Sequence, residues 1–450
     1  MPEAAVESDA SKVSNGLPSS AKKSAKQLEV LFLYTHPLPE VGAIIDHVEA
    51  LTTGSRHRVH RVNMIGELPP RLDLDRFDVI VIHYGIVISM ANHLCAESFV
   101  RIKAASPVKA VFIQDEYRHV NATVQAIKDL HINVLFTCVP EAEFEKVYPE
   151  EKLPGVRKVN VLTGYVSTGM LKTSRPKPLK DRRIDVGYRA RVLPVWLGQL
   201  GREKWRIGER FNEDAKAYKL RCDISVREED RLYGDAWDSF LADCKAVLGV
   251  ESGASVFDFS GEIQSQVASA EAANPDLTYE ELEKRFFPNL EGRIRLNQIS
   301  PRCFESAARG TLMILYEGEY SGRLQPWQHY VPLKKDHSNM AEVVQTLRDE
   351  SKAQAIADRA WEEVACATEN SYRSFSLMVD DVLENEVADQ PRRQFQQYTR
   401  AIFACASVRS AKSKMIFLKR HIIWHYPFVK TIWVFVRRFI DSKYGQPRPN

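Results

Sequence analysis

The sequence predicts an α/β protein of two tandem doubly wound domains, followed by a basic C-terminal helical tail. Short apolar segments alternate with helical segments over residues 28–166, and the same alternation starts again at residue 184. Strands that are apolar along their whole length and separated by helices are typical of a parallel sheet covered on both faces. The polar segment TSRPKPLKDRR, residues 173–183, lies between the two runs and predicts a linker.

The first domain is predicted over residues 28–172. Its strands are expected where apolar runs contain β-branched or aromatic residues, in LEVLFLYTH (28–36), RVHRVNM (58–64), DVIVIHYG (78–85), VKAVFIQDE (108–116) and NVLFTCVP (133–140). Helices are expected near residues 40–53, 92–104 and 121–130, where apolar residues recur at helical spacing.

The second domain is predicted over residues 184–390. Strands are expected in IDVGYRAR (184–191), KLRCDIS (219–225), AVLGVES (246–252) and TLMILY (311–316), with helices at 198–218, at 236–245 and after Ser300. Neither domain contains G-x-G-x-x-G or G-x-x-x-x-G-K-[ST], so an NAD enzyme and a P-loop NTPase are both poorly supported.

The composition is that of a soluble globular protein, with 27% charged and 44% hydrophobic residues in a chain of 450. Its seven cysteines are scattered and form no C-x-x-C pair, which argues against a disulfide framework and a thiolate zinc site and suits the reducing cytoplasm. Residues 1–27 are rich in Ser, Ala and Lys without an apolar segment, so we expect a disordered leader rather than a signal peptide.

Four segments of the second half carry a resemblance to a known family. They are LGVESGASVFD (248–258), N-x-I-S-P-R-x-F-E-x-A-A-x-G-T (297–311), EGEYSG (317–322) and HYVPLKKD (329–336). This half resembles the C-terminal half of GT-B glycosyltransferases of the glycosyl transferases group 1 family, and is most similar to the bacterial group related to the spore-maturation CgeB proteins. The resemblance covers residues 240–350 and is only architectural over 28–166. It implies two Rossmann-like domains facing across a cleft, the C-terminal one binding a nucleotide sugar and the N-terminal one receiving the acceptor.

The resemblance assigns a role to Glu305. Many retaining members carry two glutamates eight positions apart near the start of this helix, and the second bonds the ribose hydroxyls of the nucleotide. Glu305 matches the second position, whereas Asn297 stands at the first. An amide can bond a sugar hydroxyl but carries no negative charge. The alternative for Glu305 is a surface glutamate in an ordinary amphipathic helix.

Further donor-binding residues are predicted around this helix. Ser300 is suited to the N-cap position and Pro301 to the first helical position. The free amides of residues 302 and 303 would then be able to bind a diphosphate, and Arg302 would add a positive charge. Glu251, Ser252 and Gly253 follow a predicted strand and are expected to line the nucleotide pocket.

Catalytic residues are predicted on both sides of the cleft. Arg189 and Arg191 follow the first strand of the second domain and are expected to stabilise the leaving diphosphate without a metal or other cofactor. On the acceptor side Asp115 or His119 is the expected catalytic group, among candidates that also include His36, His83, Glu116 and Arg118. Asp73 and Asp75 form a D-x-D that precedes its strand, so it lies at the wrong edge of the sheet for metal binding.

The tail, residues 391–450, holds thirteen Lys and Arg against one acid, so its net charge of +12 leaves −9 for residues 1–390. Trp424, Phe428, Trp433 and Phe435 are interleaved with these basic residues. This pattern favours an interfacial helix on anionic lipid at the inner face of the membrane. A helix packed on the N-terminal domain stays open as an alternative, and nucleic acid is the least favoured partner.

The resemblance therefore implies a metal-independent glycosyltransferase, expected to be retaining, that moves a sugar from a nucleotide sugar to a glycan, lipid-linked or protein acceptor. Two alternatives stay open: a GT-B protein that binds glycans or nucleotides without turnover, and a nucleotide-sugar epimerase on the same fold.

Overall fold

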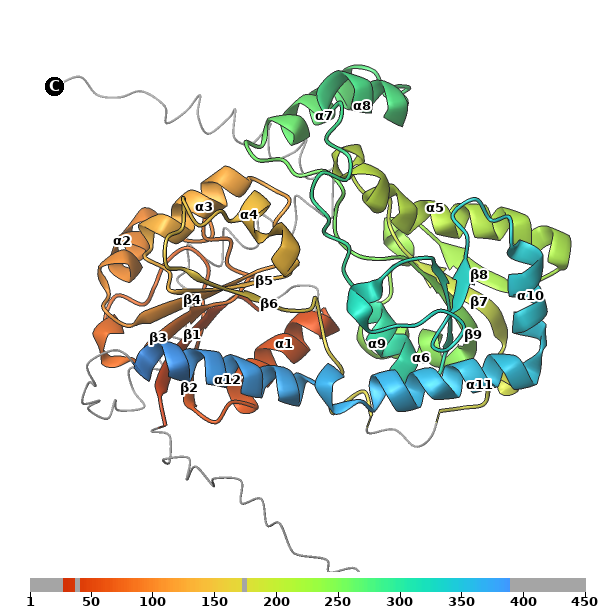
Figure 1. Cartoon of the computed structure of the whole chain (residues 1–450), viewed down its shortest axis with the longest axis horizontal. Helices are drawn as coiled ribbons and strands as arrows, with labels where there is room; N and C mark the ends of the chain where they lie inside the picture. Colours follow the sequence, from red (N-terminus) through yellow and green to blue (C-terminus); the bar gives the residue numbers. More distant parts are fainter. Residues whose placement is uncertain (1–26, 37–40, 172–175, 389–450) are drawn as a thin grey trace, which may run out of the picture.

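The computed structural model of the chain describes residues 27–36, 41–171 and 176–388. The predicted leader, apart from Gln27, and the predicted tail lie outside these residues. Two parallel sheets stand side by side, each covered by helices (Figure 1). The predicted class of two tandem doubly wound α/β domains is confirmed. No helix within the described ranges is long and apolar enough to cross a bilayer.

The first domain contains a six-stranded parallel sheet with the strand order β2-β1-β3-β4-β5-β6. All five predicted strands are present, and an edge strand that was not predicted completes the sheet because its sequence RKVN is polar and only half-buried. The bounds are β1 Glu29–Tyr34, β2 Arg58–Asn63, β3 Val79–Ile82, β4 Val108–Ile113, β5 Val134–Thr137 and β6 Arg157–Asn160. The helices are α1 Gly42–Thr53, α2 Ala96–Ala104, α3 Val120–Asp129 and the short α4 Phe144–Val147.

The second domain contains a five-stranded parallel sheet with the order β11-β10-β9-β7-β8. Its strands are β7 Ile184–Arg189, β8 Cys222–Ser225, β9 Cys244–Gly249, β10 Leu312–Tyr316 and β11 Val331–Leu333. The predicted helices are α5 Gly198–Ala215, α6 Gly234–Asp243 and α9 Pro301–Ala308. The remaining helices are α7 Glu262–Ala273, α8 Tyr279–Phe286, α10 Met340–Arg348, α11 Glu350–Ala360 and α12 Tyr372–Ala388.

Both sheets reverse their strand order beside the first strand of the domain, between β1 and β3 and between β7 and β9. Because neighbouring connections leave in opposite directions at such a point, a crevice opens there beyond the carboxyl ends of the strands. The crevice of the second domain lies beyond Arg189 and Gly249, where β7 and β9 end.

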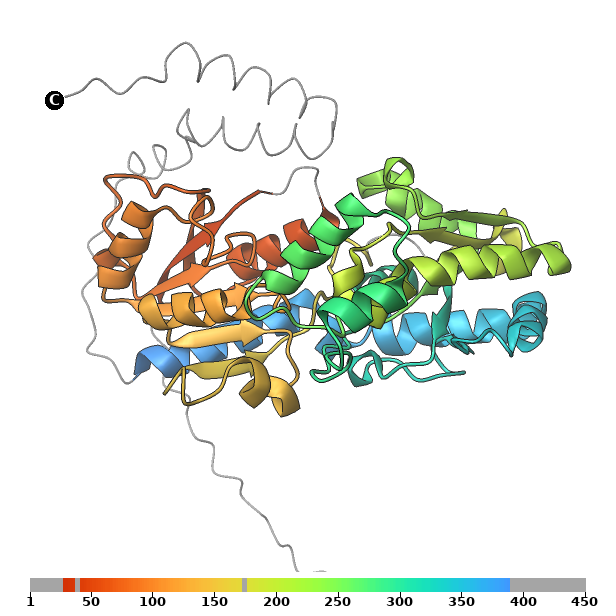
Figure 2. The same ribbon diagram turned by 90° about the horizontal axis from the view of Figure 1, so that it is seen from above.

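Helices α7 and α8 form an insertion between β9 and α9 that projects from the rest of the second domain (Figures 1 and 2). They have a small core of their own, in which Val267, Tyr279 and Phe287 pack with Trp196. The capping box of α8, in which Thr278 and Glu281 bond each other's backbone amides, begins this helix.

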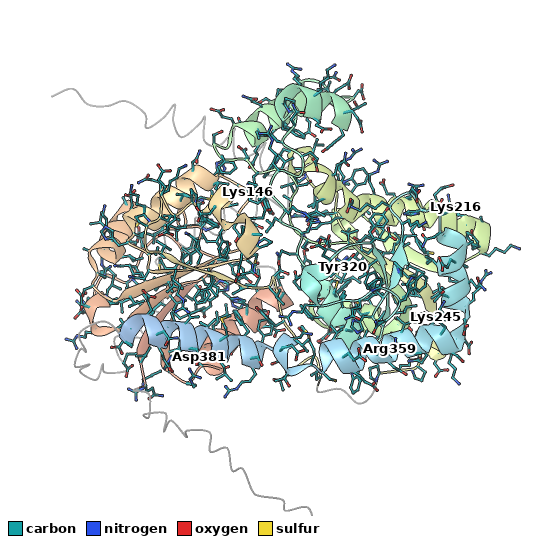
Figure 3. The ribbon with its side chains drawn as sticks, viewed as in Figure 1. Lys146, Lys216, Lys245, Tyr320, Arg359 and Asp381 are labelled. Carbon is teal, nitrogen blue, oxygen red and sulfur yellow. The ribbon has the colours of Figure 1, made fainter. Side chains whose placement is uncertain are left out.

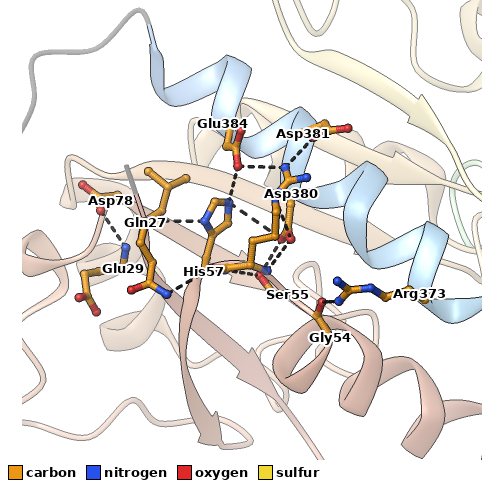
Figure 4. A network of polar contacts seen from close by, with 12 residues as sticks. Gln27, Glu29, Gly54, Ser55, His57, Asp78, Arg373, Asp380, Asp381 and Glu384 are labelled. Atoms are coloured by element: carbon orange, nitrogen blue, oxygen red, sulfur yellow. Dashed lines mark hydrogen bonds and ion pairs between the residues drawn. The ribbon is translucent and has the colours of Figure 1, made fainter. Parts of the chain in front are cut away.

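Helix α12 returns to the first domain although it follows the second sheet in the sequence. The helices α11 and α12 run in succession beneath both sheets, and α12 packs against α1 (Figure 1). Buried Asp380 accepts hydrogen bonds from Ser55 Oγ at 2.7 Å and from the backbone amide of Arg56 at 2.7 Å (Figure 4). The Arg56 side chain bonds Asp381 at 2.6 Å and Glu384 at 2.9 Å. This polar cluster fastens the end of the described chain to the first domain.

Candidate functional site

A cavity of about 690 Å³ lies between the two domains at the crevice of the second sheet. Its floor contains the ends of β7, β9 and β10, and its far wall comes from α1 and the segment 167–170 of the first domain. Among the predicted residues, those that line it are Arg189, Arg191, Ser252, Ser300, Arg302 and Glu305. The structure therefore brings six of the eleven predicted site residues to one cavity. It leaves Asp115, His119, Glu251, Gly253 and Asn297 outside its wall.

The start of α9 points into this cavity. Ser300 stands at the N-cap with extended backbone and Pro301 begins the helix, as the sequence predicts, but the Ser300 side chain makes no capping bond. The amide of Cys303 donates to the carbonyl of Ser300 at 2.9 Å. This amide is therefore already bonded, in contrast to the prediction that it is free, whereas the amide of Arg302 has no partner among the described residues.

Arg302 is held in a fixed orientation in the cavity wall. Its guanidinium lies 5.0 Å from the ring centre of Tyr188 and 5.2 Å from that of Trp237. Its Nη2 donates to the carbonyl oxygen of Arg189 at 2.7 Å. Stacking between two rings orders the cation without neutralising it, so the charge stays available to an anion.

Glu305 follows one turn later on α9 and is half-buried in the same wall. Its Oε2 accepts a hydrogen bond from Trp237 Nε1 at 2.8 Å. Burial raises the pKa of this carboxyl group above its usual value, although the bond from Trp237 and the charge of Arg302 act to lower it. Glu305 thus faces the cavity, and Trp237 bonds one of its two carboxylate oxygens.

Lys204 was not among the predicted residues, yet it lines this cavity from α5. Burial lowers the pKa of its amine to about 8, with Asp115 raising it and the charges of Arg302 and Arg191 lowering it further. Its Nζ makes no hydrogen bond or ion pair with the described residues. The sequence gives no signal for this role, because a lysine in an amphipathic helix is ordinarily solvated.

The two predicted arginines after β7 differ in their surroundings. The charge of Arg189 is already paired within the protein. Its guanidinium bonds the Asp223 carbonyl at 2.8 Å and the Asp223 carboxylate at 2.8 Å, and it lies 4.4 Å from the Phe240 ring centre. Arg191 is exposed at the cavity and forms no ion pair or hydrogen bond with any described residue. Of the pair, Arg191 is the one whose charge is free to meet a ligand.

Glu251 and Asn297 bond each other outside the cavity wall. The Asn297 amide donates to Glu251 Oε2 at 2.8 Å. Glu251 Oε1 accepts from the backbone amides of Glu319 at 3.0 Å and Tyr320 at 2.8 Å. The buried carboxylate therefore organises the EGEYSG loop, and its contacts are those of a structural residue.

The loop that contains Ser252 and Gly253 positions the entry to α9. Ser252 exchanges backbone hydrogen bonds of 2.6 and 2.8 Å with Gln298, two residues before the N-cap. Gly253 has φ 119°, and a Cβ there would collide with the carbonyl oxygen of Leu296. A glycine is required at this close approach of two backbones, and the motif holds the helix start in place.

The segment after β4, which contains His119, forms a contact between the domains. The amide of Asp258 donates to the carbonyl of Tyr117 at 2.8 Å, and the amide of Asn121 donates to that of Phe259 at 3.0 Å. His119 packs its ring against Gly261, and exposed Asp115 accepts from the Tyr117 hydroxyl at 2.9 Å. The segment after β4 thus fastens the first domain to the second beside the cavity.

The first domain contributes a carboxylate to the cavity from another place. Asp46 of α1 lies in the wall, and so does Asp238 of α6, which bonds Arg309. Burial raises the pKa of Asp46, a bond with Ser167 lowers it, and the charge of Asp238 raises it. The cavity therefore has three cations without an ion pair among the described residues, Arg191, Lys204 and Arg302, together with the carboxylates of Asp46, Asp238 and Glu305.

The D-x-D segment is used in local structure. Asp73 caps a short 3-10 turn, Leu74–Arg76, and bonds Arg76 Nε at 2.9 Å, while Asp75 accepts from the amide of Ser106 at 2.8 Å. Both precede β3 and lie away from the cavity. Within the described ranges, no three His, Cys, Asp or Glu side chains are grouped so as to hold a metal ion.

No protein-family model and no curated protein sequence matches the chain. Solved structures resemble it at low identity. An α-glucosyltransferase in complex with UDP-glucose and DNA containing an abasic site is 11% identical, with a TM-score of 0.47 over 80% of this chain and 100% of that one. HepE of Anabaena in complex with UDP is 11% identical, with a TM-score of 0.46 over 80% and 100%. Sucrose-phosphate synthase from Thermosynechococcus elongatus is 10% identical, with a TM-score of 0.43 over 81% and 100%.

Proposed function

We propose that the chain transfers a sugar from a nucleoside-diphosphate donor bound in the interdomain cavity. The observation that carries the proposal is the wall formed by Arg191, Lys204 and Arg302. Three cations from different elements converge on one hollow without a carboxylate bonded to any of them among the described residues. A diphosphate is the ligand that such a set of cations at a helix start would attract.

The remaining parts of the wall suit the rest of a nucleotide sugar. Glu305 presents a carboxylate oxygen beside the cation set, as the resemblance to GT-B enzymes implies for a group that bonds ribose hydroxyls. Ordered cations stabilise the charge that develops on the departing diphosphate, so the reaction as proposed needs no metal. We also propose that the configuration at the anomeric carbon is retained, and the family resemblance alone supports this part of the proposal.

The acceptor is proposed to enter from the first domain, where Asp46 and Ser167 line the cavity. Asp115 and His119 were predicted for this side, but His119 packs against Gly261 at the junction of the domains, and Asp115 bonds Tyr117 within the first domain. A glycan, a lipid-linked glycan and a protein all offer the required hydroxyl group.

The direct test is incubation of the full chain with UDP-, GDP- and TDP-sugars, followed by separation of nucleotides and sugars. Slow release of the free nucleoside diphosphate is expected, with one nucleotide preferred. A new nucleotide sugar without release would indicate the epimerase instead, and binding without either product the non-catalytic alternative. Absence of binding for all donors would overturn the proposal.

Glu305→Gln provides the matching binding test. The amide keeps the shape and can still accept from Trp237, but it loses the charge that strengthens hydrogen bonds to hydroxyl groups. We expect UDP affinity to fall by about tenfold to a hundredfold, corresponding to about 1.5–3 kcal/mol. Calorimetric titration of both proteins measures this, with Glu319→Gln, an exposed glutamate outside the cavity wall, as the control. An unchanged affinity in the Glu305 variant would remove this residue from the site.

A further inference from the structure

A second hollow, of about 320 Å³, lies at the end of the second sheet that is opposite to the donor cavity. It is lined by Asp185, Arg221 and Lys245, which stand at or just before the amino ends of β7, β8 and β9. All these strands are parallel, and the donor cavity lies beyond their carboxyl ends. The two hollows are therefore separated by the length of the sheet.

The charge around this second hollow is predominantly positive. Five cations line it, Lys180, Lys219, Arg221, Lys245 and Arg348, and they come from segments far apart in the chain. The acids in its lining are Asp185 and Glu350, which leaves a formal charge of +3. Such an excess in one concave place attracts a compact anion.

Asp185 neutralises only part of this charge and orients the cations that it binds. It accepts from Arg221 at the backbone amide (2.9 Å) and at Nη2 (3.0 Å), and from Lys245 Nζ at 2.9 Å. Although burial raises the pKa of Asp185, these bonds hold it at about 2, so the group is ionised at neutral pH. Arg221 and Lys245 are thus held in fixed directions at the wall.

The other three cations have no acidic partner among the described residues. Arg348 donates to the carbonyl of Tyr218 at 2.6 Å, which leaves its charge uncompensated. Lys180 and Lys219 are exposed, and the ammonium groups of their side chains form no hydrogen bond or ion pair with the part of the chain that the structure describes. The buried side chains of Leu179, Leu347 and Ala353 form an apolar floor beneath them.

We propose that this hollow binds a small phosphate monoester, with the phosphate against the lysines and the organic part on the apolar floor. The volume is near the lower end of the range for small-molecule sites, which suits a ligand of a few carbon atoms. Lysine ammonium groups bind phosphate as point charges from several directions. The same chemistry is offered by a soluble sugar phosphate and by a phosphorylated lipid headgroup.

The test uses the full chain and glucose 6-phosphate in calorimetric titration. The double variant Lys180→Glu, Lys219→Glu is expected to weaken binding at least tenfold. Lys216→Glu is the matched control, because Lys216 lies three residues before Lys219, is exposed and pairs with Glu213, and does not line the hollow. Figure 3 labels Lys216 and Lys245, which lie apart on this domain. Arg191→Ala separates the site from the donor cavity and is expected to leave binding unchanged.

A second arm distinguishes the two sources of the phosphate. Phosphatidylcholine vesicles with and without phosphatidylinositol 4-phosphate are sedimented with the same proteins. Binding of the sugar phosphate that depends on Lys180 and Lys219 supports a soluble ligand, and lysine-dependent binding to the phosphorylated vesicles alone supports a headgroup. If neither probe binds, or if binding is lost in the Lys216 or Arg191 variant rather than in the double variant, the proposal is overturned.

Discussion

Lys204 shows how one residue makes the proposed donor site depend on pH. The pKa of its amine is about 8, because burial disfavours the charged form. The free site therefore loses this charge as the pH rises through 8, and diphosphate binding is expected to weaken. Between pH 7 and 9.5 we expect UDP affinity to fall about tenfold, which corresponds to the lower end of a charge-assisted hydrogen bond.

The control for this pH dependence is Lys204→Arg. A guanidinium stays protonated throughout this range, so the alkaline loss of affinity should disappear even if the affinity at pH 7 changes. Calorimetry at pH 7 and 9.5 on both proteins makes the comparison. The same alkaline loss in the arginine variant would assign it to another group.

Asn297 provides a second prediction at the scale of single residues. The resemblance places a glutamate at this position, so Asn297→Glu would restore the sequence pattern. In this structure it would instead put a second carboxylate against buried Glu251, in place of an amide that donates at 2.8 Å. We expect a loss of about 1–3 kcal/mol in the free energy of unfolding from the missing hydrogen bond, with repulsion added.

The double variant Asn297→Glu, Glu251→Gln tests this explanation. The amide that the second substitution introduces at position 251 can donate to the new carboxylate, so much of the lost stability should return. Urea denaturation of the four proteins gives the coupling between the two positions. A stable single variant with improved turnover would show that residue 297 reaches the donor after all.

At the scale of elements, α12 owes its attachment to one buried carboxylate more than to its exposed ion pairs. Asp380→Ala leaves the Ser55 hydroxyl and the Arg56 amide without the acceptor they have in Figure 4, and a loss of about 1–3 kcal/mol of stability is expected. Asp381→Ala removes the neighbouring ion pair with Arg56. Because the Asp381 side chain is 65% exposed, the expected loss in the free energy of unfolding is less than about 1 kcal/mol. Chemical denaturation of the two variants measures the difference, and equal losses would contradict this ranking.

The elements that could be predicted from the sequence are those whose apolar composition indicates that they are buried. β3 and β5 are apolar at nearly every position and fully buried, so both were identified. β6 was missed because an edge strand needs little apolar surface, and α7 because small and polar residues give it only one buried side chain, Val267. The return of α12 to the first domain depends on contacts between residues more than 300 positions apart, which no local pattern records.

The candidate site was predictable to the extent that position relative to a strand or helix decides it. Glu305 and Arg302 line the cavity because they belong to the first turns of α9, and the start of this helix points into the cavity. The direction of each side chain was not predictable. Glu251 bonds the EGEYSG loop, and Arg189 bonds Asp223 although it lines the cavity, while the exposed Arg191 lines the cavity without an ion pair to any described residue. Lys204 reaches the cavity through the tertiary packing of α5.

At the scale of the whole molecule, charge is divided unevenly along the chain. Residues 391–450, which lie outside the described residues, hold +12, whereas residues 1–390 hold −9. Folding alone does not call for large aromatic residues such as Trp424 and Trp433 among so many basic ones. The composition predicts binding to an anionic membrane surface, where each basic residue contributes about 1 kcal/mol and the aromatic residues add an apolar part.

The two contributions respond differently to salt, and this sets the test. Screening weakens the electrostatic part, while the apolar part persists, so binding to anionic vesicles should fall with ionic strength without vanishing. Co-sedimentation with neutral and anionic vesicles compares the full chain, a 1–390 truncation, and a full-length variant with Lys419, Arg420, Arg437 and Arg438 changed to Glu. Only the unaltered full chain is expected to bind strongly. If it ignores anionic vesicles, or if the truncated chain fails to fold, the tail packs on the protein and the membrane prediction is wrong.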